Sequence, residues 1–132
     1  MYSQVNGMGL FGMNAFKVTA EIISSRGQPS FDIVGLGDLA VQESKMRIKG
    51  ALSGIGISVS GQRLTVNLAP ADVRKCGSLY DFTIIAAILA VNNIITDDLS
   101  DCAFIGEVSL GGSLVFTGGI ISMAIEGKKC GI

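Results

Sequence analysis

Charged and hydroxyl side chains that could take part in chemistry are concentrated in one polar, irregular stretch near the middle of the chain. It contains Asp72, Arg74 and Lys75, followed by Ser78 and Asp81. Loops that follow strands often carry binding residues. The charged members suggest a contact to DNA phosphate or to a protein partner, or else a solvated loop in which Asp72 caps a turn. The serine suggests a nucleophile.

The serine also has a structural explanation. Ser78 and Asp81 fit the S-x-x-[DE] capping box ahead of an apolar run, which predicts a helix over residues 79–91 with Ser78 as its cap. The chain has no histidine, so an imidazole base is excluded and a lysine would have to activate the hydroxyl. These observations favour the structural role for both residues.

Three further basic side chains, Arg26, Lys45 and Lys49, would extend a patch formed by Arg74 and Lys75. Lys45 and Lys49 share one face of a predicted helix. However, 10 basic and 11 acidic residues give a net charge of −1, without the basic excess typical of phosphate binding. A solvated polar face is therefore favoured, and a DNA-contacting surface is the alternative.

The remaining chemistry is limited. Neither the 3 cysteines nor the acidic residues between 97 and 107 have the spacing of a disulfide framework or a metal site, so we expect no metal or cofactor in this chain. No secretory signal is visible, which predicts a cytoplasmic protein. The longest apolar run, residues 82–91, is about half of the roughly 20 residues that cross a bilayer, so no membrane contact is expected.

Hydrophobic periodicity predicts the elements that position these residues. The first three predicted strands are expected to pair antiparallel, Asp38 is the predicted N-cap of the first helix, and glycines 111–112 form a hairpin turn. The order βββ-α-β-α-ββ-α indicates an α+β domain with helices packed on one face of a sheet. The predicted strands are 3–11, 15–24, 31–34, 63–68, 104–110 and 113–116, and the predicted helices are 39–53, 79–91 and 120–130.

Three stretches carry a resemblance to a known family: FDIVGL at 31–36, TVNLAPADVRK at 65–75 and GEVSLGGS at 106–113. Together they resemble the N-terminal domain of the magnesium-chelatase-like ComM/YifB AAA+ ATPases, and the resemblance covers essentially the whole chain. Two residues depart from the family pattern. Gly37 stands where the family usually has proline, and Cys76 where it usually has an acidic residue.

The resemblance implies a two-layer ribosomal-protein-S5 domain 2-like fold with a left-handed βαβ crossover, shared with the Lon protease domain. It implies that residues 1–132 form a single ChlI-type domain that stops before its last strand and before an AAA+ motor. Its implied partners are that motor and further copies of itself. The chain has no P-loop motif, so ATP and Mg²⁺ are expected only in the full-length parent, which in ComM acts in DNA branch migration during natural transformation.

Because Lon-like proteases use a serine–lysine dyad, the resemblance also allows the two corresponding positions of this sequence to be compared with that dyad. The positions that match the nucleophile and the base lysine of Lon-like proteases are Leu79 and Ile121, so both functional groups are missing. We therefore expect no enzyme activity from this chain, and a role as an assembly, docking or regulatory domain of a DNA-processing ATPase. A DNA-contacting module is the alternative, and a residual serine hydrolase is least favoured.

Overall fold

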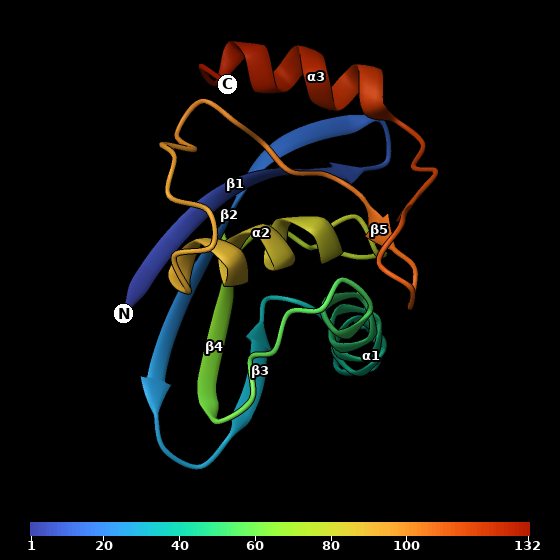
Figure 1. The fold of residues 1–132 in the computed structure, drawn as a ribbon. Coiled ribbons are helices and arrows are strands. Elements are labelled where there is room, and N and C mark those ends of the chain that lie inside the picture. Colours follow the sequence, from blue (N-terminus) through green and yellow to red (C-terminus); the bar gives the residue numbers. More distant parts are fainter.

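A four-stranded sheet forms the centre of the molecule (Figure 1). The computed structural model describes residues 1–132. The sheet has the order β1-β2-β4-β3; β1 pairs with β2 and β2 with β4 antiparallel, while β3 and β4 are parallel. The strands are β1 (Tyr2–Phe11), β2 (Asn14–Arg26), β3 (Ser30–Val34) and β4 (Gln62–Ala69).

The position of β3 differs from the sequence prediction. The first three strands were expected to pair in succession, but β4 lies between β2 and β3. The helix between β3 and β4 makes this possible, because a crossover connection lets two strands run parallel. Alternate residues of β4, among them Leu64, Val66 and Leu68, are fully buried, which suits an inner strand. The prediction of an antiparallel β3 was therefore wrong.

Three helices and a short hairpin complete the predicted order of elements. They are α1 (Asp38–Gly54), α2 (Asp81–Val91), β5 (Glu107–Val108), β6 (Leu114–Val115) and α3 (Ile120–Lys129). This confirms the α+β class. None of these helices has the length and apolar character that crossing a membrane requires.

The helices lie on both faces of the sheet rather than on one. In β1, a Cβ on Gly7 would meet Thr83 of α2, whereas the next residue, Met8, lies against Gly127 of α3. Successive residues of a strand point to opposite faces, so α2 and α3 cover opposite sides of β1, as Figure 1 also shows. The prediction of helices on one face holds for α1 and α2, which share the main core, and is wrong for α3.

The predicted helix caps also differ from the structure. Asp38 is the first residue of α1, and Gly37 occupies the N-cap position. Helix α2 begins at Asp81 after Tyr80, and no side chain caps its first turn. The capping box expected from Ser78 and Asp81 is therefore absent, because both side chains have other partners, described below.

Tyr80 yields a prediction about alkaline stability. Its side chain is 1 % exposed, and its hydroxyl has no hydrogen-bond partner. Burial raises the pKa of Tyr80 from 10.0 to about 12, and the nearby Cys76 adds to this. Because the folded state holds this proton more tightly, the stabilising contribution is complete below pH 10 and is lost as the pH rises through 12.

We expect Tyr80→Phe to be neutral or slightly stabilising at pH 7, since the unpaired hydroxyl only adds a desolvation cost. Between pH 10 and 12 the variant should lose less stability than the original chain, by roughly 1–3 kcal/mol at the upper end. Urea unfolding at a series of pH values measures both effects. A parallel decline of the two proteins would contradict the assignment, and Tyr2→Phe, at an exposed tyrosine, is the control.

Candidate functional site

A buried charged cluster lies where α1, α2 and β5 meet, and Asp81 is its centre. The Asp81 side chain is only 1 % exposed. Arg47 donates to it from two nitrogens, Nε to Oδ2 at 2.6 Å and Nη2 to Oδ1 at 3.1 Å. Ser44 Oγ donates to Oδ1 at 2.7 Å, and the backbone N–H of Val108 lies 3.4 Å from Oδ2. The carboxylate is thus fully engaged with α1 and β5.

Local sequence explains how these side chains meet. Ser44 and Arg47 are three residues apart on α1 and so point to the same side of the helix. Asp81 is in the first turn of α2, where a negative charge interacts favourably with the helix dipole. The cluster therefore joins the two helices that share one face of the sheet.

Electrostatics favour the charged form of the arginine. The hydrogen bond to Asp81 raises the pKa of Arg47 above its ordinary value, and burial opposes this rise. The negative charges of Asp81, Glu107 and Glu43 raise it further. A guanidinium that is charged at all accessible pH values and held by a carboxylate cannot act as a general base.

Ser78 lies at the edge of this cluster and donates a hydrogen bond to Glu107 Oε2. Both residues border an open cleft of about 450 Å³ between the start of α1 and the segment before α2. The other lining residues are Leu39, Ala40, Glu43, Arg47 and Gly77. The serine is therefore half-buried beside carboxylates and an arginine, without a lysine among the lining residues.

Lys75 is buried rather than solvated. This corrects both interpretations of the sequence, in which Lys75 was either a solvated loop residue or a surface contact to DNA phosphate or a partner. The residue is 4 % exposed, and Nζ donates to the carbonyl oxygens of Pro70 and Val73, the latter at 2.9 Å. Burial lowers the pKa of Lys75, and the charge of Asp72 acts in the opposite direction. The ammonium group holds the loop from inside, so it is not available to a phosphate on the surface.

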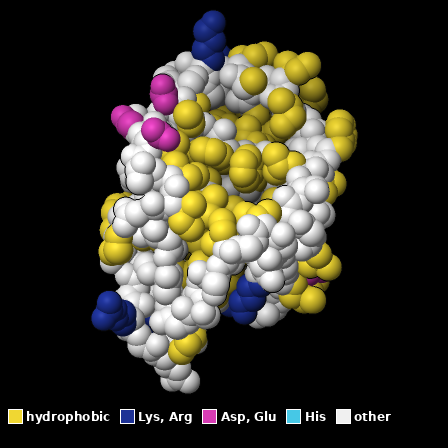
Figure 2. Space-filling view, in the orientation of Figure 1, with side chains coloured by type: hydrophobic (Ala, Val, Ile, Leu, Met, Phe, Trp, Pro, Cys, Tyr) yellow, Lys and Arg dark blue, Asp and Glu magenta, His cyan; other side chains and the backbone are white.

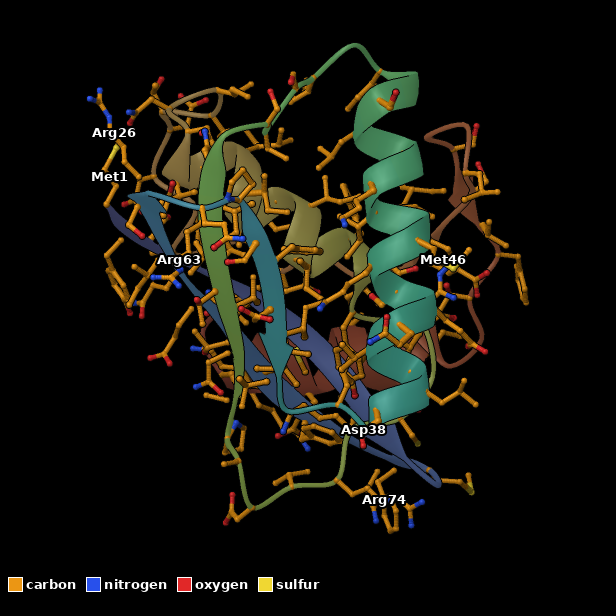
Figure 3. The ribbon with its side chains drawn as sticks, turned by 90° about the horizontal axis from the view of Figure 1, so that it is seen from below. Met1, Arg26, Asp38, Met46, Arg63 and Arg74 are labelled. Atoms are coloured by element: carbon orange, nitrogen blue, oxygen red, sulfur yellow. The ribbon has the colours of Figure 1, made fainter.

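The other predicted basic residues do not form one patch with Arg74. Figure 3 shows Arg26 at one end of the molecule and Arg74 at the opposite end, near Asp38. Lys45 Nζ on α1 lies 3.9 Å from Asp32 Oδ1 on β3. Lys49, one helical turn further along α1, is exposed. Asp72 is exposed as well. The structure thus separates the proposed DNA-contacting surface into at least two parts.

Sequence reasoning missed the partners of Asp81. In the sequence, Arg47 lies on the polar side of the predicted helix 39–53, and Ser44 lies on its apolar side. Glu107 is one of the acidic residues whose spacing does not indicate a metal site. A signal was present: Ser44 occupies a core-facing helical position, and a polar residue there needs a buried partner. Its identity depends on how α1 packs against α2, which local patterns do not specify.

Comparisons with known proteins give one consistent family. The model of the family described as subunit ChlI of Mg-chelatase matches residues 20–132. YifB of Escherichia coli K12 is 36 % identical over 130 residues, which is 98 % of this chain and 26 % of YifB. Competence protein ComM of Haemophilus influenzae Rd is 35 % identical over 119 residues, 89 % of this chain and 23 % of ComM. The chain spans about a quarter of the length of these relatives.

Proposed function

Because this chain belongs to the Mg-chelatase subunit ChlI family, with YifB and ComM among its relatives, we propose that it is a non-catalytic assembly and regulatory domain of a longer AAA+ ATPase. The relatives' length supports this, since about three quarters of each relative lies outside the matched region. A domain of this kind works by positioning a neighbouring motor.

The engagement of the Asp81 cluster is the observation that carries the proposal. Asp81, Arg47 and Ser44 are all committed to holding α1 against α2. Ser78 has Glu107 as its partner rather than a lysine or histidine base. The residues that match the Lon dyad positions, Leu79 and Ile121, are apolar. The site is thus arranged to connect elements rather than to activate a nucleophile.

The rest of the proposal concerns the longer protein. We propose the ribosomal-protein-S5 domain 2-like fold with its left-handed crossover for this domain, and an adjacent motor that uses ATP and Mg²⁺ in a homo-oligomer. We propose that the longer protein takes part in DNA processing, which is supported by the name of one relative, competence protein ComM. We also propose that it is located in the cytoplasm. Direct DNA contact by this chain is disfavoured, because its basic residues lie apart and Lys75 is buried.

The proposal predicts the behaviour of a hybrid protein. Replacing the matched quarter of E. coli YifB with this chain should retain the ATPase rate and oligomeric state of YifB, whereas deleting that quarter should lower both. The Ser78→Ala hybrid should match the hybrid with Ser78, because the serine does no chemistry. ATP hydrolysis and sedimentation measure these properties.

A fluorophosphonate probe distinguishes the hydrolase alternative. We expect no covalent labelling of this chain at Ser78. Stoichiometric labelling that disappears in Ser78→Ala would contradict the non-catalytic assignment. An unchanged ATPase rate and oligomeric state after the deletion would contradict the assembly and regulatory role.

A further inference from the structure

An apolar patch is exposed at the end of the molecule where the β1–β2 turn meets the start of α3. Leu10, near the end of β1, lies so close to Gly119 that a Cβ on the glycine would overlap the leucine side chain. This contact brings the turn beside the first residues of α3, as Figure 1 also shows. The patch consists of six exposed side chains on the turn, on the segment before α3 and on α3 itself: Phe11, Met13, Phe116, Ile120, Ile121 and Ile125.

The outer face of α3 is apolar where a polar face is expected. Met123 and Gly127 are buried on the side of the helix that faces the sheet. Ile121 and Ile125 are four residues apart and so share another face, and both are exposed. A helix that packs on a sheet normally has polar residues on the side that faces water. The two isoleucines therefore indicate that a second apolar surface covers α3.

The patch is large for a surface that faces water. Its side chains are between 45 % (Ile120) and 92 % (Phe116) exposed. At about 200 Å² for a fully exposed side chain of this size, the six together present roughly 800 Å². The largest apolar patch on a typical monomer covers about 300–600 Å². The patch thus has the size of an interaction site.

No charged residue interrupts the patch. Its six side chains all come from residues 5–16 and 108–125, and these two segments contain no Asp, Glu, Lys or Arg. In Figure 2 the acidic side chains gather at the upper left, whereas apolar side chains cover the upper right, where the turn and the start of α3 lie. A charged partner surface would lose its hydration here without gaining a counter-charge. The patch therefore fits an uncharged apolar surface.

A second copy of the chain presents such a surface. In a two-fold symmetric dimer the same patch lies on both sides of the contact, so no charge is buried. A standard stable interface buries about 800 Å² on each partner, which the patch supplies, and aromatic residues and methionine are enriched in such interfaces. The net charge of −1 gives little repulsion between copies.

We propose that the chain forms a two-fold symmetric dimer through the apolar patch. Phe116 and Ile121 are its main contacts, because they are highly exposed and come from two segments of the patch. The proposal concerns this chain without a motor, so it can fail while the proposed function holds.

Sedimentation equilibrium of the 132-residue chain tests the proposal. We expect a monomer–dimer equilibrium with a Kd on the order of 10 µM. Phe116→Gln and Ile121→Gln should each raise this Kd at least about tenfold, because each substitution acts on both sides of a two-fold contact. Both side chains are exposed, so urea unfolding of the monomers should have unchanged midpoints.

Met46→Gln is the matched control. Met46 is an exposed apolar residue on α1, outside the patch (Figure 3), and its replacement should leave the Kd unchanged. A chain that stays monomeric up to about 500 µM, a dimer that persists in both patch variants, or equal weakening by Met46→Gln would each overturn the proposal. Growth beyond the dimer with rising concentration would also overturn it, because a two-fold contact closes at two copies.

Discussion

Asp81→Ala should lower the free energy of unfolding by about 3 kcal/mol, the largest loss that we expect from any single polar side chain in this protein. The substitution removes every acceptor that Arg47 and Ser44 use. Ser44 is 2 % exposed, so its hydroxyl would stay buried without a partner. The Arg47 side chain is 21 % exposed, so its guanidinium can be partly hydrated once the carboxylate is gone. The expected loss of stability is therefore at the lower end of the range for broken buried ion pairs. Urea unfolding at pH 7 measures it.

Two further variants separate charge from packing. Asp32→Ala breaks an ion pair of 3.9 Å whose carboxylate is 64 % exposed, and it should cost less than about 1 kcal/mol. The double variant Arg47→Met with Asp81→Leu should recover part of the loss, because no buried charge then lacks a partner. A loss for Asp81→Ala no greater than that for Asp32→Ala would contradict the central role of this cluster.

Gly7→Ala should cost about 2 kcal/mol because β1 has no room for a methyl group at this position. A Cβ on Gly7 would lie 2.4 Å from Thr83 Oγ1 and 2.7 Å from Thr83 Cγ2. Thr83 is fully buried, and its hydroxyl donates to Phe104 O at 2.6 Å. Relieving the clash would break that hydrogen bond or separate α2 from the sheet. Thermal unfolding should show a melting temperature lower by several degrees.

Gly118→Ala is the matched control for this prediction. A Cβ there meets no atom within 4 Å, so the substitution should change stability by no more than about 0.5 kcal/mol. If Gly7→Ala were as well tolerated as Gly118→Ala, the close packing of α2 on β1 would be wrong.

The helices and strands were predictable from the sequence where a local period of apolar residues determines them. Alternation in residues 16–22 identified β2, and Val18, Ala20 and Ile22 are indeed buried. The pairing of β3 was not predictable, because the sequence of a strand of 5 residues does not indicate which strand lies beside it. Its partner depends on where α1 returns the chain.

The candidate site was predictable only in part, for a related reason. The sequence predicted a capping role for Ser78 and Asp81. That role was wrong, because the two side chains bond to Glu107 and Arg47, which are distant in sequence. Lys75 looks solvated by composition, and tertiary burial removes it from water. Local patterns report which side chains are polar, whereas the packing of whole elements determines which polar groups meet.

The contact between β1 and α3 has a consequence for the order in which the chain folds during synthesis. Met8, in the first strand, packs on Gly127 in the last helix, and both are buried. During translation this side of β1 stays uncovered until α3 has been made and has left the ribosome. Contacts between residues so far apart in sequence form late and slow the folding of a domain. A chaperone that binds nascent apolar strands would therefore find β1 available until α3 emerges.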